Sequence, residues 1–324
     1  MKFNFVISGY NNDSNAMKLY EFDNCKVKEL NSIILDNPSY VTSFGSIVFT
    51  YTKNPLYMVM FEVRNNDFKE LDRIELGLKS MTHLTYSEKN KCLYGASYLD
   101  GCIVKIDVND KNKFGNLKKL SHKDLYGEDS KCHAIIMNED ETIVCVVNIA
   151  TDSLYFYDTN LNLIKIIKVK DGAGPRHAIW VKNMIYCMTE YSNEVIVIDY
   201  DKGVIQYESS LLKETIESGI KSNGATLFMY NGFIYASNRG EETIAKFEVL
   251  KNKKIKYLGS FSCNGNHPRH MIEYSGLILN CNKNSNNVSI IDIENEKEVA
   301  GLVFPKPSGV CVVKQGGEYG RKEC

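Results

Sequence analysis

The chain has 324 residues, of which 44% are apolar and 24% are charged, values typical of a globular protein with an ample core. Its 39 Lys and Arg residues almost balance its 40 Asp and Glu residues, which leaves a formal net charge of -1. This balance argues against a sequence-independent nucleic-acid binder, because such a protein needs a positive field to replace counterions.

Apolar segments are short throughout the chain. The longest runs, such as 56–61 and 143–147, have the length of a strand, and none approaches the ~20 residues that a membrane helix needs. The N-terminus has too short an apolar stretch for a signal peptide. Ten Cys are scattered without a Cys-x-x-Cys pair, and many lie inside apolar strand patterns. We therefore expect a cytoplasmic protein with buried free thiols and without a membrane segment, disulfide framework or zinc site.

One unit recurs along the chain: an apolar strand, a short polar turn, and an alternating strand that ends in Asp or Glu. Two weaker copies end at residues 23 and 62, and clearer ones follow at 93–107, 146–158, 186–199, 235–248 and 279–292. The closing acidic residues lie 39 to 51 residues apart, and their mean spacing of about 45 is that of a four-stranded propeller blade. The best helix candidate is one short amphipathic stretch, 209–218.

Seven copies predict an all-β fold: a single domain over residues 1–324, a seven-bladed β-propeller with four-stranded antiparallel blades. Apolar segments remain after the last copy, at 299–304 and 310–313. We expect these C-terminal strands to share a blade with the N-terminal strands and so close the ring, because closure leaves only short sheet edges. The tail around 316–322 is expected to be frayed.

The short motifs that mark the blades of other propellers are missing here, which excludes two propeller classes. The WD type needs Trp-Asp at strand ends, but the one Trp, Trp180, is followed by Val181. The kelch type needs a double Gly in each blade, and Gly-Gly occurs only at 316–317. Other motifs must therefore identify the family.

Five short motifs lie in register with the blade period. They are Asn-Pro-Ser-Tyr at 37–40, Cys-His-Ala at 132–134, Gly-Ala-Gly-Pro-Arg-His at 172–177 with Thr-Glu at 189–190, Tyr-Ala-Ser-Asn-Arg-Gly at 235–240, and His-Pro-Arg-His at 267–270. In their order and spacing the chain resembles the seven-bladed β-propeller lactonases, which include bacterial 6-phosphogluconolactonases and carboxymuconate lactonizing enzymes. The chain departs from the family pattern at 134, 148–152 and 283, so the resemblance leaves the exact substrate open.

The blade register gives an argument that does not depend on the resemblance. Nine residues before the closing acid of five copies lie Tyr98, Ile149, Glu190, Arg239 and Lys283. An equivalent position in successive blades projects to a similar radius and height, so these side chains should surround one end of the channel. Three of the five are charged, whereas a purely structural position would repeat one residue type. Solvated turn charges are the alternative interpretation.

Arginine is scarce in this chain, and three of its six copies fall at blade-register positions. Arg176 and Arg269 each lie in a Pro-Arg-His triplet, and Arg239 is the third. A planar guanidinium binds carboxylate or phosphate through two parallel hydrogen bonds, which indicates an anion site. Capping of blade carbonyls by these side chains is the alternative.

These residues predict a lactonase of carbohydrate metabolism, with a cleft at one channel end for a small anionic sugar lactone, foremost 6-phosphogluconolactone. Glu190 is the candidate general base that activates water, and His133 is the alternate base or proton shuttle. Arg176 and Arg239 are candidates for stabilising the tetrahedral oxyanion. The resemblance implies the same four residues as the active site.

Five further residues are candidates for binding the substrate. Arg269 and Lys283 would anchor its phosphate or carboxylate group. His177 and His270 follow the two register arginines directly, although one of them could simply pack against its neighbour. Asn238 lies in the most specific of the motifs, 235–240.

Several alternatives stay open at this point. The sequence contains no Gly-x-Ser-x-Gly motif, which disfavours an acyl-enzyme route. It also contains no His-Glu-x-x-His or comparable metal-binding spacing, and we predict no metal and no other cofactor. Calcium-dependent propeller lactonases gather carboxylates and Asn at the axis, so a channel metal is not excluded. The same residues suit a muconate-type lactonizing cycloisomerase, and a non-catalytic propeller that binds a ligand or partner is a third function. We predict no nucleic-acid or membrane partner and no particular oligomeric state.

Overall fold

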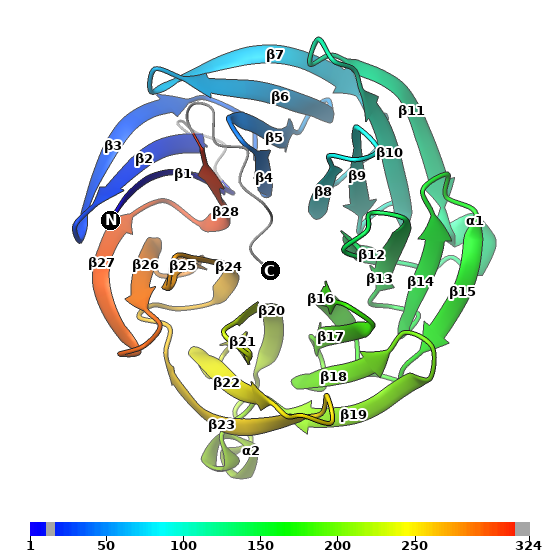
Figure 1. Ribbon diagram of the computed structural model, residues 1–324, viewed down its shortest axis with the longest axis vertical. Coiled ribbons are helices and arrows are strands. Elements are labelled where there is room, and N and C mark those ends of the chain that lie inside the picture. The colour runs from blue at the N-terminus through cyan, green and yellow to red at the C-terminus, as the bar shows by residue number, and fades with distance from the viewer. Residues whose placement is uncertain (11–16, 315–324) are drawn as a thin grey trace.

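Seven four-stranded antiparallel sheets form a closed ring in the computed structural model (Figure 1). The structure describes residues 1–10 and 17–314, except for the side chain of Ile216. The predicted all-β, seven-bladed propeller is confirmed. The tail that we expected to be frayed lies outside the described residues.

Each sheet is one blade and runs from an inner to an outer strand. The first three blades in chain order are β28 (Pro307–Val313), β1 (Lys2–Gly9), β2 (Met17–Asp23), β3 (Lys26–Ile33); β4 (Val41–Phe44), β5 (Ile47–Thr52), β6 (Tyr57–Arg64), β7 (Asp67–Glu75); and β8 (His83–Ser87), β9 (Cys92–Ser97), β10 (Cys102–Val108), β11 (Phe114–Ser121). The other four are β12 (Cys132–Met137), β13 (Ile143–Asn148), β14 (Ser153–Asp158), β15 (Leu163–Lys168); β16 (Pro175–Val181), β17 (Met184–Thr189), β18 (Glu194–Asp199), β19 (Gly203–Ser209); β20 (Asn223–Tyr230), β21 (Phe233–Arg239), β22 (Thr243–Val249), β23 (Ile255–Ser262); and β24 (Pro268–Tyr274), β25 (Leu277–Asn282), β26 (Asn287–Asp292), β27 (Lys297–Val303).

The ring closes as the sequence predicted. Strand β28 pairs antiparallel with β1, with Val6 opposite Cys311 and Asn4 opposite Val313. The last described strand therefore supplies the inner strand of the first blade, and the closure removes what would otherwise be two open sheet edges.

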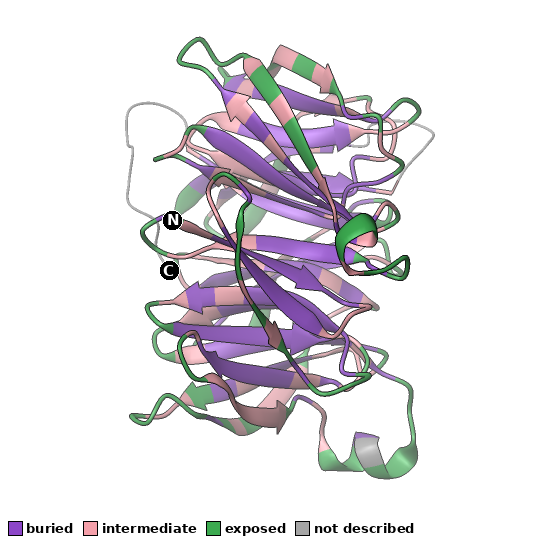
Figure 2. Cartoon of the chain, turned by 90° about the vertical axis from the view of Figure 1, so that its right-hand side faces the viewer, coloured by how far each residue is buried: buried purple, intermediate pink, exposed green. Residues whose placement is uncertain are grey.

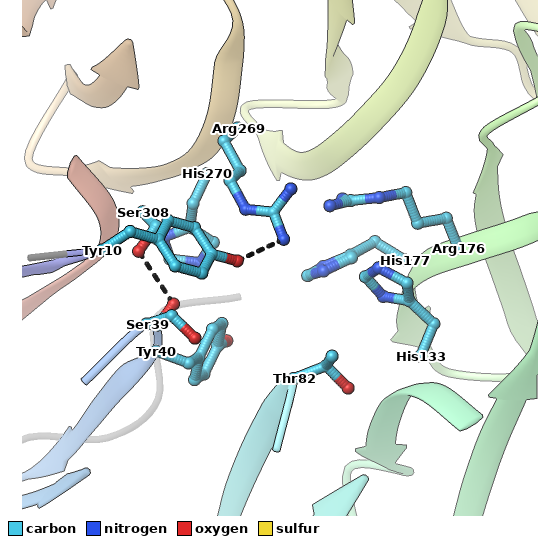
Figure 3. Close-up of a pocket in the computed structure, with 10 residues that line it drawn as sticks. All are labelled: Tyr10, Ser39, Tyr40, Thr82, His133, Arg176, His177, Arg269, His270 and Ser308. Atoms are coloured by element: carbon cyan, nitrogen blue, oxygen red, sulfur yellow. Dashed lines mark hydrogen bonds between the residues drawn. The ribbon is translucent and has the colours of Figure 1, made fainter. Parts of the chain in front are cut away.

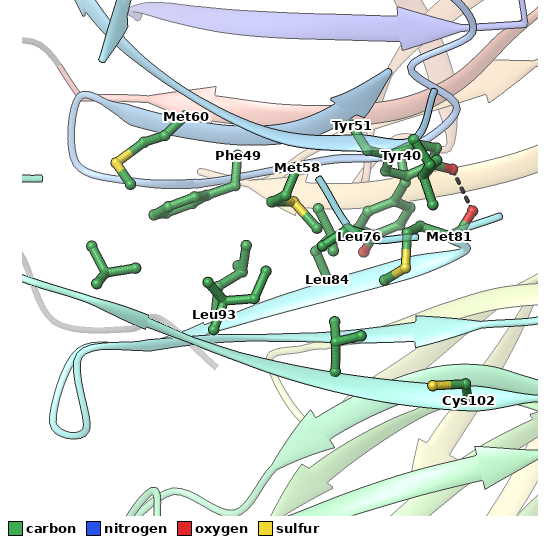
Figure 4. Packing of buried hydrophobic residues seen from close by; sticks show 14 residues of the cluster. Tyr40, Phe49, Tyr51, Met58, Met60, Leu76, Met81, Leu84, Leu93 and Cys102 are labelled. Atoms are coloured by element: carbon green, nitrogen blue, oxygen red, sulfur yellow. Dashed lines mark hydrogen bonds between the residues drawn. The ribbon is translucent and has the colours of Figure 1, made fainter. Parts of the chain in front are cut away.

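The second strands of the blades are largely buried on both faces, because each face packs against a neighbouring blade. Every residue of β9, β17 and β25 is buried, whereas the outer strands β11 and β15 are largely exposed (Figure 2). Between the second and third blades, Phe49, Met58 and Leu93 belong to one buried cluster (Figure 4). Each such side chain contributes about 1.5–3 kcal/mol by leaving water.

In the described part of the chain, helical structure is confined to two short connections. Strand β19 is followed by α2 (Lys213–Ser218), which lies within the stretch expected at 209–218. The sequence did not predict α1 (His122–Tyr126), whose first turn is capped by the Ser121 hydroxyl, an acceptor for the backbone N–H of Asp124 at 3.2 Å. Among the described residues, no helix has the length and apolar character needed to cross a bilayer.

The nine described cysteines are free thiols, and eight of them are buried. The expectation of buried thiols holds for these eight. Cys25 is the exception and is exposed, because it lies at the turn between β2 and β3.

Gly224 fixes how closely β20 approaches the neighbouring blade. A Cβ atom there would lie 2.0 Å from the Thr189 carbonyl oxygen and 2.3 Å from Met188 Cε. We expect Gly224→Ala to lower the free energy of unfolding by about 2–3 kcal/mol, because the backbone must shift to accept the methyl group. Urea denaturation measures the loss.

Gly115→Ala on β11 is the matched control, since its Cβ would approach only as near as 3.3 Å, to Asp107 Cβ. A surface change of this kind is expected to alter stability by less than about 1 kcal/mol. An equal loss for both variants would contradict the close approach at Gly224.

Candidate active site

A pocket opens at the channel, between the inner strands of the ring (Figure 3). Its empty volume is about 280 Å³, which includes its open mouth. The lining residues come mainly from or just before the inner strands, and they are Tyr10, Ser39, Tyr40, Thr82, His133, Arg176, His177, Arg269, His270 and Ser308.

Three β-bulges bring the main charged and imidazole groups into this pocket. The pairing register of the inner strand shifts at His133 in β12, at Arg176 in β16 and at Arg269 in β24. A bulge inserts one extra residue and re-aims its side chain, which an ordinary strand would alternate between faces. The three residues therefore occupy the same place in their blades, and the register inferred for the two arginines is confirmed.

A second blade position adds Glu190, Lys283 and Tyr10, each the first residue after the second strand of its blade. Their backbone N–H groups donate to the loop before the inner strand: Glu190 to Gly174 at 2.7 Å, Lys283 to His267 at 3.1 Å, and Tyr10 to Lys306 at 3.1 Å. Because each of the three residues makes this equivalent backbone hydrogen bond, their side chains lie at the same end of the ring.

Glu190 joins two guanidinium groups at its oxygen Oε2. Arg176 Nε donates to this oxygen at 2.8 Å, and Arg239 Nη2 lies 3.1 Å from it. Burial by itself raises the pKa of Glu190, but the charges of Arg176 and Arg239 outweigh burial and hold the pKa below its ordinary value. The carboxylate is therefore ionised at neutral pH, and its ion pairs make it a weak base.

The arginines also cap backbone carbonyls, so this alternative from the sequence holds alongside the ion pairs. Arg176 Nη1 donates to the Ala225 carbonyl at 2.5 Å, and Arg239 Nη2 donates to the Gly224 carbonyl at 2.6 Å. Arg269 differs: within the described part of the chain its one hydrogen bond is from Nη2 to the Tyr10 hydroxyl, at 2.6 Å. Arg269 is therefore the guanidinium with the most N–H groups available to a ligand.

His133 offers the pocket a neutral imidazole. Burial, followed by the charges of Arg176 and Arg269, holds its pKa well below the ordinary 6.5. Its atom Nδ1 is buried and has no hydrogen-bond partner among the described residues. A buried polar atom of this kind costs free energy unless a ligand or water satisfies it.

The other channel histidines are more strongly tied to the fold. Nδ1 of His83 accepts the backbone N–H of Ile135 at 3.5 Å, and Nδ1 of His270 accepts that of Val310 at 3.2 Å, in each case from the next blade. Burial lowers the pKa of both rings to about 3. The His177 ring lies 5.0 Å from that of His83, centroid to centroid. In the described ranges, no three His, Cys, Asp or Glu side chains are grouped so that they could hold a metal ion.

Comparison with known proteins now identifies the family. The profile of the family "Lactonase, 7-bladed beta-propeller" matches residues 4–313. The chain belongs to this family. The resemblance inferred from the five motifs is thereby confirmed.

Individual relatives of this propeller lactonase family member are distant. A 6-phosphogluconolactonase of Bacillus subtilis (strain 168) is 24% identical over 301 residues, which cover 86% of this chain and 85% of the relative. A solved structure from Lactobacillus plantarum has a TM-score of 0.86 at 16% identity and covers 97% of this chain and 100% of its own. The periplasmic gluconolactonase of Pseudomonas aeruginosa has a TM-score of 0.85 at 17% identity, covering 97% and 99%. At these identities the two structures show a shared fold.

In this family member most of the predicted site residues gather at one place. His133, Arg176, Arg269, His177 and His270 line the pocket. Glu190 adjoins the pocket because it pairs with the lining residue Arg176, and Arg239 pairs with the same carboxylate. Lys283 lies beside another lining residue, with its Nζ 5.3 Å from the centre of the Tyr10 ring.

Asn238 does not point into the pocket. Its amide is fully buried, donates to the Ser210 carbonyl at 2.7 Å and accepts from the Ser210 hydroxyl at 2.7 Å. The side chain therefore fastens the connection after β19 to β21.

Tyr10 is the main residue that the sequence reasoning missed. Counting nine residues back from Asp23, as in the other copies, lands on Ser14, because the connection after Tyr10 is longer than in other blades. Counting forward from the end of the second strand would have found it. Ser39, Thr82 and Ser308 also line the pocket and were not proposed as site residues, because small hydroxyl residues give no distinctive signal in a sequence.

Proposed function

We propose that this protein hydrolyses a small anionic sugar lactone, and that 6-phosphogluconolactone is its substrate. The surplus of positive charge around the pocket carries this proposal: Glu190 pairs with Arg176 and Arg239, whereas Arg269 and Lys283 form no ion pair with a carboxylate among the described residues. Partly buried charges without a partner are costly, so a doubly charged phosphate is a better ligand than a neutral sugar.

His133 is the general base in the proposed reaction. It takes a proton from water, and the resulting hydroxide attacks the lactone carbonyl carbon, while Arg176 stabilises the tetrahedral oxyanion. The sequence hypothesis placed Glu190 first for this role and His133 second. Two ion pairs hold the Glu190 carboxylate, whereas His133 Nδ1 has no hydrogen-bond partner among the described residues; this contrast favours His133 as the base, and Glu190 instead positions Arg176 and Arg239.

Substrate binding strengthens this base. Arg176, Arg269 and Arg239 all lower the pKa of His133 in the free site. A bound phosphate offsets their field, so the pKa of His133 rises when the substrate arrives. By linkage, the anion also binds more tightly to the protonated histidine.

Lys283 is proposed to select the phosphorylated lactone together with Arg269. We expect Lys283→Gln to raise the KM for 6-phosphogluconolactone roughly tenfold, the value of one charge-assisted hydrogen bond, with kcat changed less than about threefold. Initial rates over a substrate series separate the two constants. Lys246→Gln is the control, because Lys246 on β22 pairs with Glu296 in the turn before β27, outside the pocket, and its replacement should leave both constants unchanged. A fall in kcat with an unchanged KM would contradict a binding role.

The proposed activity is tested with purified protein and three freshly made substrates: 6-phosphogluconolactone, the unphosphorylated gluconolactone and a muconate lactone. We expect proton release well above the spontaneous rate with the first and a much weaker rate with the second. Rates no greater than spontaneous hydrolysis with all three would remove the enzymatic proposal. Conversion of the muconate lactone alone would replace it with the cycloisomerase.

A further inference from the structure

We propose that Tyr10 is a catalytic residue that donates its hydroxyl proton to the ring oxygen leaving when the lactone opens. The inference rests on the proposed lactone hydrolysis and adds the acid that this reaction needs. The ring oxygen departs as the alkoxide of an ordinary alcohol, which is far more basic than a phenol. A proton must therefore reach it as the bond to the carbonyl carbon breaks.

Tyr10 lies where such an acid is needed. It lines the same pocket as His133, and in Figure 3 the two side chains lie on opposite sides, with the Arg269 guanidinium group and the His177 ring between them. A base on one side and an acid on the other is the arrangement that addition of water followed by expulsion of an alcohol requires.

Among the described residues, no hydrogen-bond acceptor takes the proton of the Tyr10 hydroxyl, so this proton is available to the substrate. A guanidinium can only donate, so the Tyr10 oxygen accepts from Arg269 Nη2 at 2.6 Å and its own O–H is not used in that bond. Burial alone raises the pKa of Tyr10, but the charge of Arg269, the nearby Ser39 side chain and the charges of Lys53 and Arg176 together outweigh burial and lower it. The same contacts stabilise the phenolate left after proton transfer.

The cations near Tyr10 also match the order of groups in the substrate. The Tyr10 ring lies beneath Arg269 at 5.2 Å and Lys283 at 5.3 Å, both measured to the ring centre, and these are the proposed phosphate ligands. In 6-phosphogluconolactone the ring oxygen lies between the carbonyl carbon and the carbon that bears the phosphate arm. A phosphate at Arg269 and a carbonyl carbon at His133 thus leave the ring oxygen on the Tyr10 side.

The reaction is balanced without any added reagent. His133 takes one proton from water, and a new bond forms between the water oxygen and the carbonyl carbon. The oxyanion then collapses, the bond from the carbonyl carbon to the ring oxygen breaks, and the Tyr10 proton moves to that oxygen. Proton release from the histidine and reprotonation of the phenolate through solvent restore both groups.

The pH dependence follows from the charges that surround this hydroxyl. They belong to several blades and are Arg269, Arg176, Arg239, Lys53, Lys283 and the Tyr51 hydroxyl. Tyr10 must carry its proton to act as an acid, so kcat falls as the pH rises through its pKa. Because that pKa is below the ordinary 10.0, the basic limb is expected below pH 10.

Tyr10→Phe is the test, because it removes the proton and keeps the ring under the two cations. We expect kcat on 6-phosphogluconolactone to fall about 100-fold, KM to change less than about threefold, and the basic limb of kcat to disappear. Tyr57→Phe is the matched control: its ring also faces an arginine, Arg73 at 5.8 Å, but lies outside the pocket. It should leave kcat unchanged.

Three outcomes would overturn the inference. An unchanged kcat in Tyr10→Phe would remove the acid role. A raised KM with an unchanged kcat would show that Tyr10 only positions Arg269. A wild-type protein that opens no lactone would overturn the proposed function as well, which distinguishes the two failures. If Tyr10→Phe misfolds, fluorotyrosine placed at position 10 replaces it, and its more acidic phenol must move the basic limb of kcat to lower pH.

Discussion

Replacing His133 with Gln is expected to lower kcat on 6-phosphogluconolactone by at least about 100-fold, the usual effect of losing a general base. The amide keeps a similar shape but cannot take the proton from water. KM should change less than about threefold, because the proposed phosphate ligands Arg269 and Lys283 remain. Steady-state kinetics over a pH series measures both effects.

The pH series gives a second readout for His133. The imidazole acts as a base only when neutral, so kcat/KM falls as the pH drops through the pKa of the free enzyme. Because burial and the guanidinium groups lower that pKa, the acidic limb due to His133 should lie below pH 6.5 and vanish in His133→Gln.

His122→Gln is the control for this prediction. His122 is also buried and neutral, but it bonds to the Tyr157 hydroxyl at 2.9 Å, away from the pocket. Its replacement should leave kcat per folded molecule unchanged. If His133→Gln retained wild-type kcat while Glu190→Gln lost it, the original assignment of Glu190 as the base would return.

Glu190→Gln is expected to lower the free energy of unfolding by about 3 kcal/mol, because it leaves buried guanidinium groups without a counter-charge. Arg176 is only 2% exposed and Glu190 is 22% exposed. Activity should fall as well, since Arg176 and Arg239 lose the carboxylate that orients them. Urea denaturation at pH 7 measures the stability change.

Glu70→Gln provides a matched ion pair at the surface. Arg73 donates to Glu70 through Nε at 2.6 Å and through Nη2, but the two side chains are 48% and 34% exposed. An exposed pair of this kind contributes less than about 1 kcal/mol. If Glu190→Gln and Glu70→Gln lost similar amounts of unfolding free energy, the conclusion that Glu190 neutralises buried guanidinium groups would be contradicted.

The stability contribution of Glu190 also has a predicted pH dependence. Its pKa is lower in the folded protein than the ordinary 4.5. The contribution is therefore complete above the unfolded-state value and is lost as the pH falls through the lower folded-state pKa. The stability difference between wild type and Glu190→Gln should accordingly shrink below about pH 4.5.

The fold was predictable because it repeats. Each copy of the alternating strand with its closing acidic residue indicates another blade of the same kind. The apolar segment at 310–313, which follows the last copy, predicted the strand β28 that closes the ring. Local exceptions were not predictable in this way. Helix α1 depends on the cap of one residue, Ser121, and the longer connection after Tyr10 shifted the count in the first blade.

The candidate site was predictable where charge and register coincide. Arg176, Arg269 and Glu190 are unusual residue types at repeated positions, and the structure brings them together. Asn238 was drawn in by its motif, whereas its amide serves the backbone of the next connection. The role of His133 depends on which of its nitrogens is left without a partner, and only three-dimensional contacts reveal that.

The most direct test of the account is a crystal structure with the product, 6-phosphogluconate, bound at saturating concentration. We predict that its phosphate contacts Arg269 and Lys283, and that its new carboxylate lies against Arg176 and within hydrogen-bond distance of His133. A product molecule bound on the outer strands, or an empty pocket under the same conditions, would contradict the account.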